Sequence, residues 1–178
     1  MARLLQRPLR LAILAAANFA AMVVLDACWF RPAAGGLASL DTRVTGFTTE
    51  DAFQWLTALG PQGREAIIVW HYLTFDLTFP ALFSLAVAGF VLTYARRLDR
   101  FKSLPRRAQT LCALAVPLPY ALADYGQNLL VVRMLAAPVD VSQALAAAAS
   151  VLVILKFAFC IAALAIVAAA IMAARRTD

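Results

Sequence analysis

Residues 66–95 read AIIVWHYLTFDLTFPALFSLAVAGFVLTYA, an apolar run in which Asp76 is the one carboxylate and no lysine or arginine occurs. A helix of about 20 apolar residues crosses about 30 Å of hydrocarbon, so this run predicts a transmembrane helix with length to spare. Similar runs cover residues 9–30, 108–132 and 141–174. The sequence therefore predicts an all-α integral membrane protein, a single four-transmembrane-helix bundle formed by residues 1–178.

The composition excludes an ordinary soluble domain. Hydrophobic residues make up 63% of the chain and the mean hydropathy is +0.79, whereas soluble domains are roughly 45–50% apolar. Cys28, Cys112 and Cys160 lie at different predicted depths and predict no disulfide. With one histidine and no H-E-x-x-H motif, the sequence indicates neither a two-histidine haem site nor a zinc site. We therefore expect no metal and no cofactor.

Basic residues gather in the segments that would lie on one side of the membrane. Residues 96–107 carry six lysines and arginines, and others precede the first apolar run and follow the fourth, whereas loop 31–65 carries few for its length. The positive-inside rule then predicts a multi-pass protein of the inner (cytoplasmic) membrane, with both termini in the cytoplasm and loop 31–65 outside. Because residues 96–107 adjoin two spans, we expect them to contact anionic lipid headgroups rather than nucleic acid.

Loop 31–65 contains the pattern of one short amphipathic helix. Thr48 is the predicted N-cap, two acids follow it, apolar residues recur at helical spacing up to Leu59, and Gly60-Pro61 should end the helix. So short a helix is marginal alone and needs a surface to lie on. Two interpretations are open: the helix lies in the membrane interface with Trp55 as an aromatic anchor, or it covers the polar residues within the membrane as a lid.

Four charged side chains lie within the apolar runs: Asp26, Asp76, Asp124 and Lys156. Each costs about 2.5–3.5 kcal/mol at the centre of a bilayer, so such residues usually face the protein interior and pair with one another. A spacing of about four residues adds further polar side chains to the same face of each helix. We therefore expect one polar cluster in the outer half of the membrane.

Three acids and one base leave a surplus of negative charge, which would attract a proton, a cation or a hydrogen-bonding ligand. In an enzymatic version, Asp76 or Asp124 is the catalytic acid or base and Lys156 stabilises developing negative charge. The alternative is a sealed network that specifies helix packing and nothing more. The candidate ligand-binding residues are Asn18, Asp26, Arg64, His71, Tyr72, Tyr120 and Asn128.

Three segments carry a family resemblance: SLDTRVTGFTTEDAFQWLTALGPQGREA at residues 39–66, FDLTFP at 75–80 and LADYGQN at 122–128. Together they resemble a group of small four-transmembrane-helix bacterial membrane proteins of unestablished function. The resemblance implies the four-span architecture and no reaction. The residues that it singles out are Asp41, Gly63, Arg64, Asp76, Pro80, Asp124 and Asn128.

The leading hypothesis is an outward-facing intramembrane polar cavity that binds, and in an enzymatic version modifies, a lipid or amphipathic small molecule. The second is a non-catalytic accessory or assembly subunit, whose alanine-rich fourth helix (residues 144–149 and 162–170) packs against a membrane partner or a second copy of the chain. The third is a proton-coupled small-molecule transporter acting as a dimer. A pocket that reaches Asp76 and Asp124 would favour the first hypothesis, and a sealed cluster would favour the second.

Overall fold

The computed structural model describes residue 5 and residues 7–176, and these residues form helices with no β-strand among them. The main helices are α2 (Pro8–Leu25), α4 (Thr49–Ile67), α5 (Asp76–Ala95), α7 (Arg106–Ala115), α8 (Leu118–Ala136) and α9 (Gln143–Arg175). The shorter elements are the π-helices η1 (Asp26–Phe30) and η3 (Ile68–Phe75), the 3₁₀-helices η2 (Leu40–Thr42) and η4 (Pro138–Asp140), and the short α-helices α3 (Arg31–Ala33) and α6 (Asp99–Lys102).

Three continuous helical stretches of the described chain are long and apolar enough to cross a membrane: Pro8–Ala33, Thr49–Ala95 and Gln143–Arg175. They contain the predicted first and second apolar runs and all but the first two residues of the fourth. The predicted third span, residues 108–132, is divided between α7 and α8 at Pro117. Proline lacks the amide hydrogen that the helix needs at this point, and α8 also carries Asp124, Gln127, Asn128 and Arg133. The structure therefore supports a membrane protein with three helices that meet this criterion.

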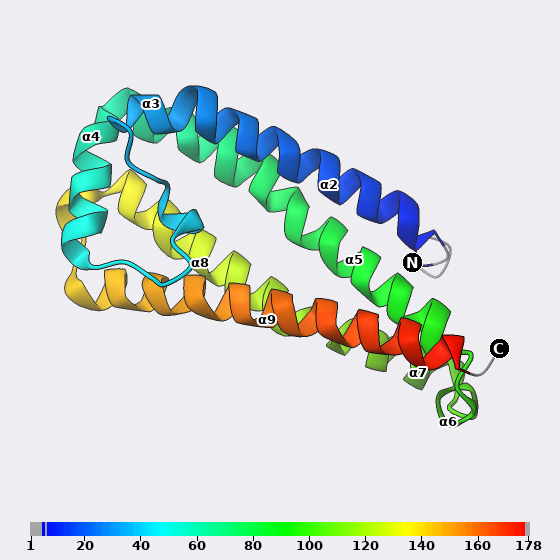
Figure 1. Cartoon of the computed structure of the whole chain (residues 1–178). Coiled ribbons are helices and arrows are strands. Elements are labelled where there is room, and N and C mark those ends of the chain that lie inside the picture. The colour runs from blue at the N-terminus through cyan, green and yellow to red at the C-terminus, as the bar shows by residue number, and fades with distance from the viewer. Residues whose placement is uncertain (1–4, 6, 177–178) are drawn as a thin grey trace.

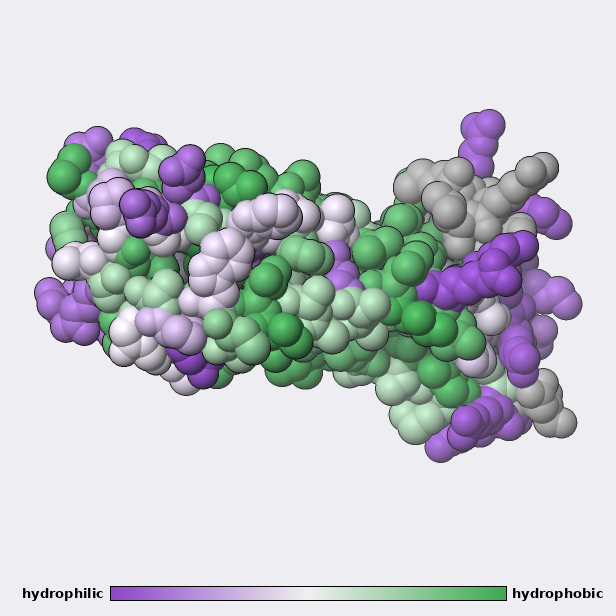
Figure 2. All heavy atoms as spheres, turned by 90° about the horizontal axis from the view of Figure 1, so that it is seen from above, coloured by the Kyte–Doolittle hydropathy of each residue, from purple (hydrophilic) through white to green (hydrophobic). Residues whose placement is uncertain are grey.

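The long helices α2, α5, α8 and α9 run beside one another, and α5 packs against α2, α8 and α9 (Figure 1). The chain between α2 and α5 lies at one end of the molecule, while α2 begins and α9 ends near α6 at the other end. Seen from above, hydrophobic side chains cover the middle of the molecule and hydrophilic side chains gather at its two ends (Figure 2). Apolar side chains on these helices remain exposed, such as Leu129 (70%) and Ile161 (68%), as expected of a surface that faces lipid rather than water.

Helix α4 packs into the core, which corrects the interface-anchor interpretation of Trp55. Trp55 is 1% exposed, and with Leu56 it belongs to a buried apolar cluster that includes Met134 of α8 and Val153 of α9. The predicted helix end at Gly60-Pro61 is also only partly right. Gly60 has φ +62°, which kinks the helix, and the chain resumes a helical course that runs into η3 and α5. A glycine is needed there because this left-handed conformation is strained for other residues.

The predicted N-cap of α4 is confirmed: Thr48 and Asp51 form a reciprocal capping box. The segment before it is held on α9, because the Phe47 amide donates to Ser150 Oγ at 2.8 Å. Gly46, at φ +86°, allows this approach, since a Cβ there would lie 2.6 Å from Ser150 Oγ. These contacts fix the loop that carries η2 and therefore place Asp41 beside the long helices.

The π-helix η3 leads directly into α5 and sets the direction of two side chains. A π-helix bonds residue i to residue i+5, and the Asp76 amide indeed donates to the His71 carbonyl. This spacing brings His71 and Asp76 onto one face, with His71 Nε2 3.9 Å from Asp76 Oδ2. The α-helical spacing of four residues would instead group Tyr72 with Asp76, with His71 next to Tyr72.

Candidate functional site

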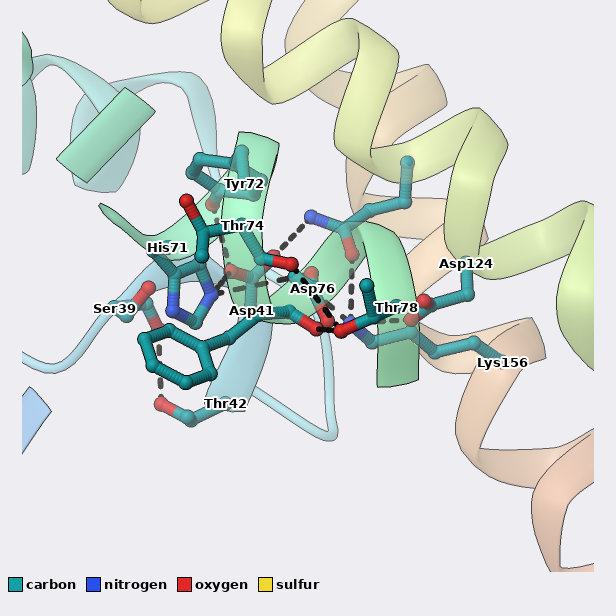
Figure 3. A network of polar contacts seen from close by, with 12 residues as sticks. Ser39, Asp41, Thr42, His71, Tyr72, Thr74, Asp76, Thr78, Asp124 and Lys156 are labelled. Atoms are coloured by element: carbon teal, nitrogen blue, oxygen red, sulfur yellow. Dashed lines mark hydrogen bonds and ion pairs between the residues drawn. The ribbon is translucent and has the colours of Figure 1, made fainter. Parts of the chain in front are cut away.

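Asp41 lies at the centre of a buried polar cluster, although it belongs to the loop between the first two long helices. Its Oδ2 atom accepts a hydrogen bond from the Tyr72 hydroxyl at 2.7 Å and lies 2.9 Å from His71 Nε2. Its Oδ1 atom accepts a hydrogen bond from the Gln127 side-chain amide. Donors from η3 and α8 therefore converge on one carboxylate (Figure 3).

Lys156 supplies the cluster with its ammonium group. Its Nζ atom lies 3.1 Å from Asp124 Oδ1 and donates to Gln127 Oε1 at 2.7 Å, and it lies 3.9 Å from Asp41 Oδ1. The residue is 7% exposed, and a lysine buried this deeply keeps its charge when carboxylates surround it. The predicted pairing of Lys156 with Asp124 is thus present, and Gln127 connects this pair to Asp41.

The charge state of Asp41 follows from these neighbours. Burial alone would raise the pKa of its carboxyl, but the Lys156 ammonium and the hydrogen bonds from His71 and Tyr72 outweigh burial. They hold the pKa of Asp41 below its usual range. Asp41 is therefore an anion at neutral pH, and its ionised form contributes to the stability of the fold.

Two other carboxylates have oxygens that remain unpaired. Asp76 Oδ2 and Asp124 Oδ2 are buried and have no hydrogen-bond partner among the described residues. A buried acceptor without a partner is costly, so each exception calls for an explanation. The α5 helix is also opened beside Asp76, because Pro80 has no amide hydrogen for the Asp76 carbonyl.

A cavity of about 760 Å³ reaches this cluster. Side chains of α2, α5 and α9 form its walls, and both apolar and polar side chains line it. One part is apolar and includes Phe19, Phe83, Phe90 and Leu164. Polar and charged side chains also belong to the lining: Asp26, Arg31, Ser39, Asp41, Thr42, His71, Asp76, Asp124 and Lys156.

Most of the predicted site residues lie in the cluster or along the cavity. The cavity lining includes Asp76, Asp124, Lys156 and His71. Tyr72 does not line the cavity, but its hydroxyl donates a hydrogen bond to Asp41. The remaining predicted residues that line the cavity are Tyr120, whose ring meets Phe83 edge-on, and Asp26, which is paired with Arg31 at 2.9 Å.

Four predicted ligand-binding residues do not line the cavity: Tyr72, which bonds Asp41, and Arg64, Asn18 and Asn128. Arg64 donates to the Leu56 carbonyl at 3.0 Å, where it supports the kinked helix. Asn18 donates to Thr78 Oγ1 at 2.6 Å and ties α2 to α5. Asn128 is buried, and its Oδ1 atom has no hydrogen-bond partner within the described part of the chain. Helical spacing placed the last two on the correct helices, but the direction of each side chain is set by packing.

The central residues that spacing did not assign to the site are Asp41 and Gln127. Asp41 lies in a loop, where no periodicity indicates which way a side chain points, and the family resemblance was the one signal for it. Gln127 follows Asp124 by three residues and so shares its helix face. The lid interpretation of the α4 helix is wrong, since none of its residues line the cavity; residues Ser39, Asp41, Thr42 and Val44 of the preceding loop do so instead.

Three side chains of the cluster, Asp41, His71 and Asp76, are of the types that bind metal ions. One ligand atom each from Asp41, His71 and Asp76 lies within 4.8 Å of the others, and all three residues are buried. The sequence predicted no metal site, because the chain has one histidine and no H-E-x-x-H motif. No protein-family model, no curated protein and no solved structure matches the chain, so the geometry alone bears on function.

Proposed function

We propose that this chain is a four-span inner-membrane protein whose intramembrane cavity binds a lipid or another amphipathic molecule. The observation that carries the proposal is the two-part lining of the 760 Å³ cavity. Its volume falls within the roughly 300–1,000 Å³ of small-molecule sites. An apolar wall with charged side chains at one end suits a molecule with an apolar chain and a polar head.

The length of the cavity fits an extended chain. Its lining residues on α5 run from Asp76 to Phe90, which is about 21 Å at 1.5 Å per residue. An acyl chain would lie against Phe83 and Phe90, and its head would meet the unpaired carboxylate oxygens of Asp76 and Asp124. A network that served packing alone would have little reason to leave these buried acceptors unpaired.

The charge distribution supports an orientation for this proposal. Residues 96–107 and the basic end of α9 lie at the same end of the molecule, and the polar cluster lies toward the opposite end (Figure 1). By the positive-inside rule the basic end, and with it both termini, faces the cytoplasm. The split third helix, α7 and α8, then completes the four spans, and the cavity's polar end lies in the outer half of the membrane.

Narrowing the apolar part should remove the ligand without altering any charge. Ala16 lines the cavity on α2, whereas its neighbour Ala17 is exposed and does not line it. We expect Ala16→Trp to lose bound lipid after purification from nanodiscs of phosphatidylethanolamine and phosphatidylglycerol, while Ala17→Trp keeps as much as the unaltered protein. Native mass spectrometry of the three proteins measures the retained lipid.

Equal retention by Ala16→Trp and Ala17→Trp would contradict the proposal. The accessory-subunit hypothesis would then be preferred, because α9 exposes alanines such as Ala147 and Ala165 that no described residue covers. The same spectra also show whether the protein retains more phosphatidylethanolamine or more phosphatidylglycerol, which tests whether the polar end of the cavity recognises the headgroup. A preference that disappears in Asp76→Asn assigns headgroup recognition to that carboxylate.

A further inference from the structure

We propose that Asp41, His71 and Asp76 bind a divalent transition-metal ion, such as Zn²⁺, at the polar end of the cavity. The set offers one imidazole nitrogen and two carboxylates, all buried, with ligand atoms within 4.8 Å of one another. Ca²⁺ takes six to eight oxygen ligands and Mg²⁺ keeps several waters, whereas imidazole with carboxylate suits Zn²⁺ and its neighbours. The ion would take the Asp76 oxygen that the head of the amphipathic ligand meets in the metal-free protein, so in the metal-bound protein that head would contact the ion's open positions instead.

The distances fit such an ion with small adjustments. Two ligand atoms about 2.1 Å from a tetrahedral metal lie about 3.4 Å apart. His71 Nε2 lies 2.9 Å from Asp41 Oδ2 and 3.9 Å from Asp76 Oδ2, on either side of that value. His71 and Asp76 share a face because η3 is a π-helix. Each of the three residues lines the cavity.

One unpaired atom points to the same conclusion. Asp76 is 3% exposed, and its Oδ2 atom has no hydrogen-bond partner among the described residues. A metal ion at His71 Nε2 and Asp76 Oδ2 would satisfy this acceptor directly. The nearby carboxylates of Asp41, Asp76 and Asp124 carry three formal negative charges against one positive charge on Lys156, and a divalent ion balances the remaining two.

Lys156 does not occupy the site that the ion would take. Its ammonium lies 3.1 Å from Asp124 Oδ1 and 2.7 Å from Gln127 Oε1. Its contact with Asp41, at 3.9 Å, is to Oδ1, whereas His71 lies against Oδ2. Lys156 and Gln127 would therefore hold one Asp41 oxygen from the outer shell, while the other oxygen would bind the metal beside the Tyr72 hydroxyl that donates to it, an arrangement that orients a ligating carboxylate.

The test uses the full chain purified without a polyhistidine tag and titrated with Co²⁺ and then with Zn²⁺. We expect one ion per chain, a Co²⁺ absorption spectrum of low coordination number, and displacement by Zn²⁺. Asp76→Asn should weaken Co²⁺ binding by at least the roughly 10–100-fold that outer-shell partners contribute. The matched control Asp140→Asn changes an exposed acid and should bind as the unaltered protein does.

X-ray absorption of the Zn²⁺-loaded protein keeps the proposal testable if Asp76→Asn does not fold. Because the chain has a single histidine, a single imidazole among the scatterers identifies His71. A folded protein that binds no Co²⁺ would overturn the proposal and indicate that protons balance the cluster. Sulfur scattering from a cysteine, or unchanged affinity in Asp76→Asn, would also overturn it. Lipid retention is measured independently with Ala16→Trp, so each proposal can fail alone.

Discussion

Lys156→Met should lower the free energy of unfolding by about 3–5 kcal/mol, because removing one partner of a buried ion pair leaves an uncompensated charge. Lys156 lies 3.1 Å from Asp124 and 3.9 Å from Asp41, and it is the cation that these two buried carboxylates share. Methionine nearly preserves the side-chain volume, so the loss reports charge rather than packing. The thermal unfolding midpoint of the purified protein measures it.

The matched control is Lys102→Met, because Lys102 is exposed at the basic end of the molecule. A surface ion-pair change is worth about 0–1 kcal/mol, so this variant should unfold close to the unaltered protein. Adding Asp124→Asn to Lys156→Met should recover part of the stability, since it removes one of the unpaired charges. If Lys156→Met and Lys102→Met had the same midpoint, the ammonium would not be part of a buried network.

Asp41→Asn should be comparably destabilising, with an expected loss of about 3–5 kcal/mol. The Asp41 carboxylate is the common acceptor for Tyr72, His71 and Gln127, and hydrogen bonds to a charged group contribute about 1.5–3 kcal/mol each. An asparagine of the same shape has one acceptor oxygen and turns its amide hydrogens toward donors. Thermal unfolding of this variant beside Asp140→Asn, an exposed acid, measures the difference.

The effect of Asp41→Asn should depend on pH in a defined direction. The folded protein holds the pKa of Asp41 below its usual range, chiefly because the attraction of Lys156 and the hydrogen bonds of His71 outweigh burial. A depressed pKa stabilises the fold fully above the unfolded value of about 3.9, and this stabilisation is lost as the pH falls through that value toward the folded pKa. The gap between the unaltered protein and Asp41→Asn should therefore be present at neutral pH and narrow below about pH 4. A gap that persisted unchanged into stronger acid would contradict the ionised state of Asp41.

The sequence predicted the long helices well because hydrophobic length is a strong and local signal. The runs at 9–30 and 66–95 lie within two of the long apolar helical stretches, and the run at 141–174 lies within the third except for its first two residues. The third run was predicted as one continuous helix, but it is divided at Pro117 into α7 and α8, and α8 is rich in polar residues. The cost of charge inside apolar helices also predicted that Asp124 and Lys156 pair, and the two side chains lie 3.1 Å apart.

The rest of the site depends on contacts that no helical period encodes. Asp41 reaches the cluster because Gly46 and Phe47 hold its loop on Ser150 of α9, a contact between residues about a hundred positions apart. His71 turns toward Asp76 because the helix there is a π-helix. The sequence allowed Trp55 to be an interfacial anchor, although the residue is buried in the core. A period of 3.6 residues shows which face of a helix is apolar but not what covers that face.

The central claim is that an amphipathic molecule lies in the cavity between α2, α5 and α9 with its head at Asp76. A cryo-electron microscopy structure of the protein in a lipid nanodisc tests it most directly. The account predicts elongated density along Phe83 and Phe90 that ends at the carboxylates of Asp76 and Asp124. A structure in which α2 closes onto α9, so that Phe19 contacts Leu164 and Asp76 is sealed from any cavity, would contradict it.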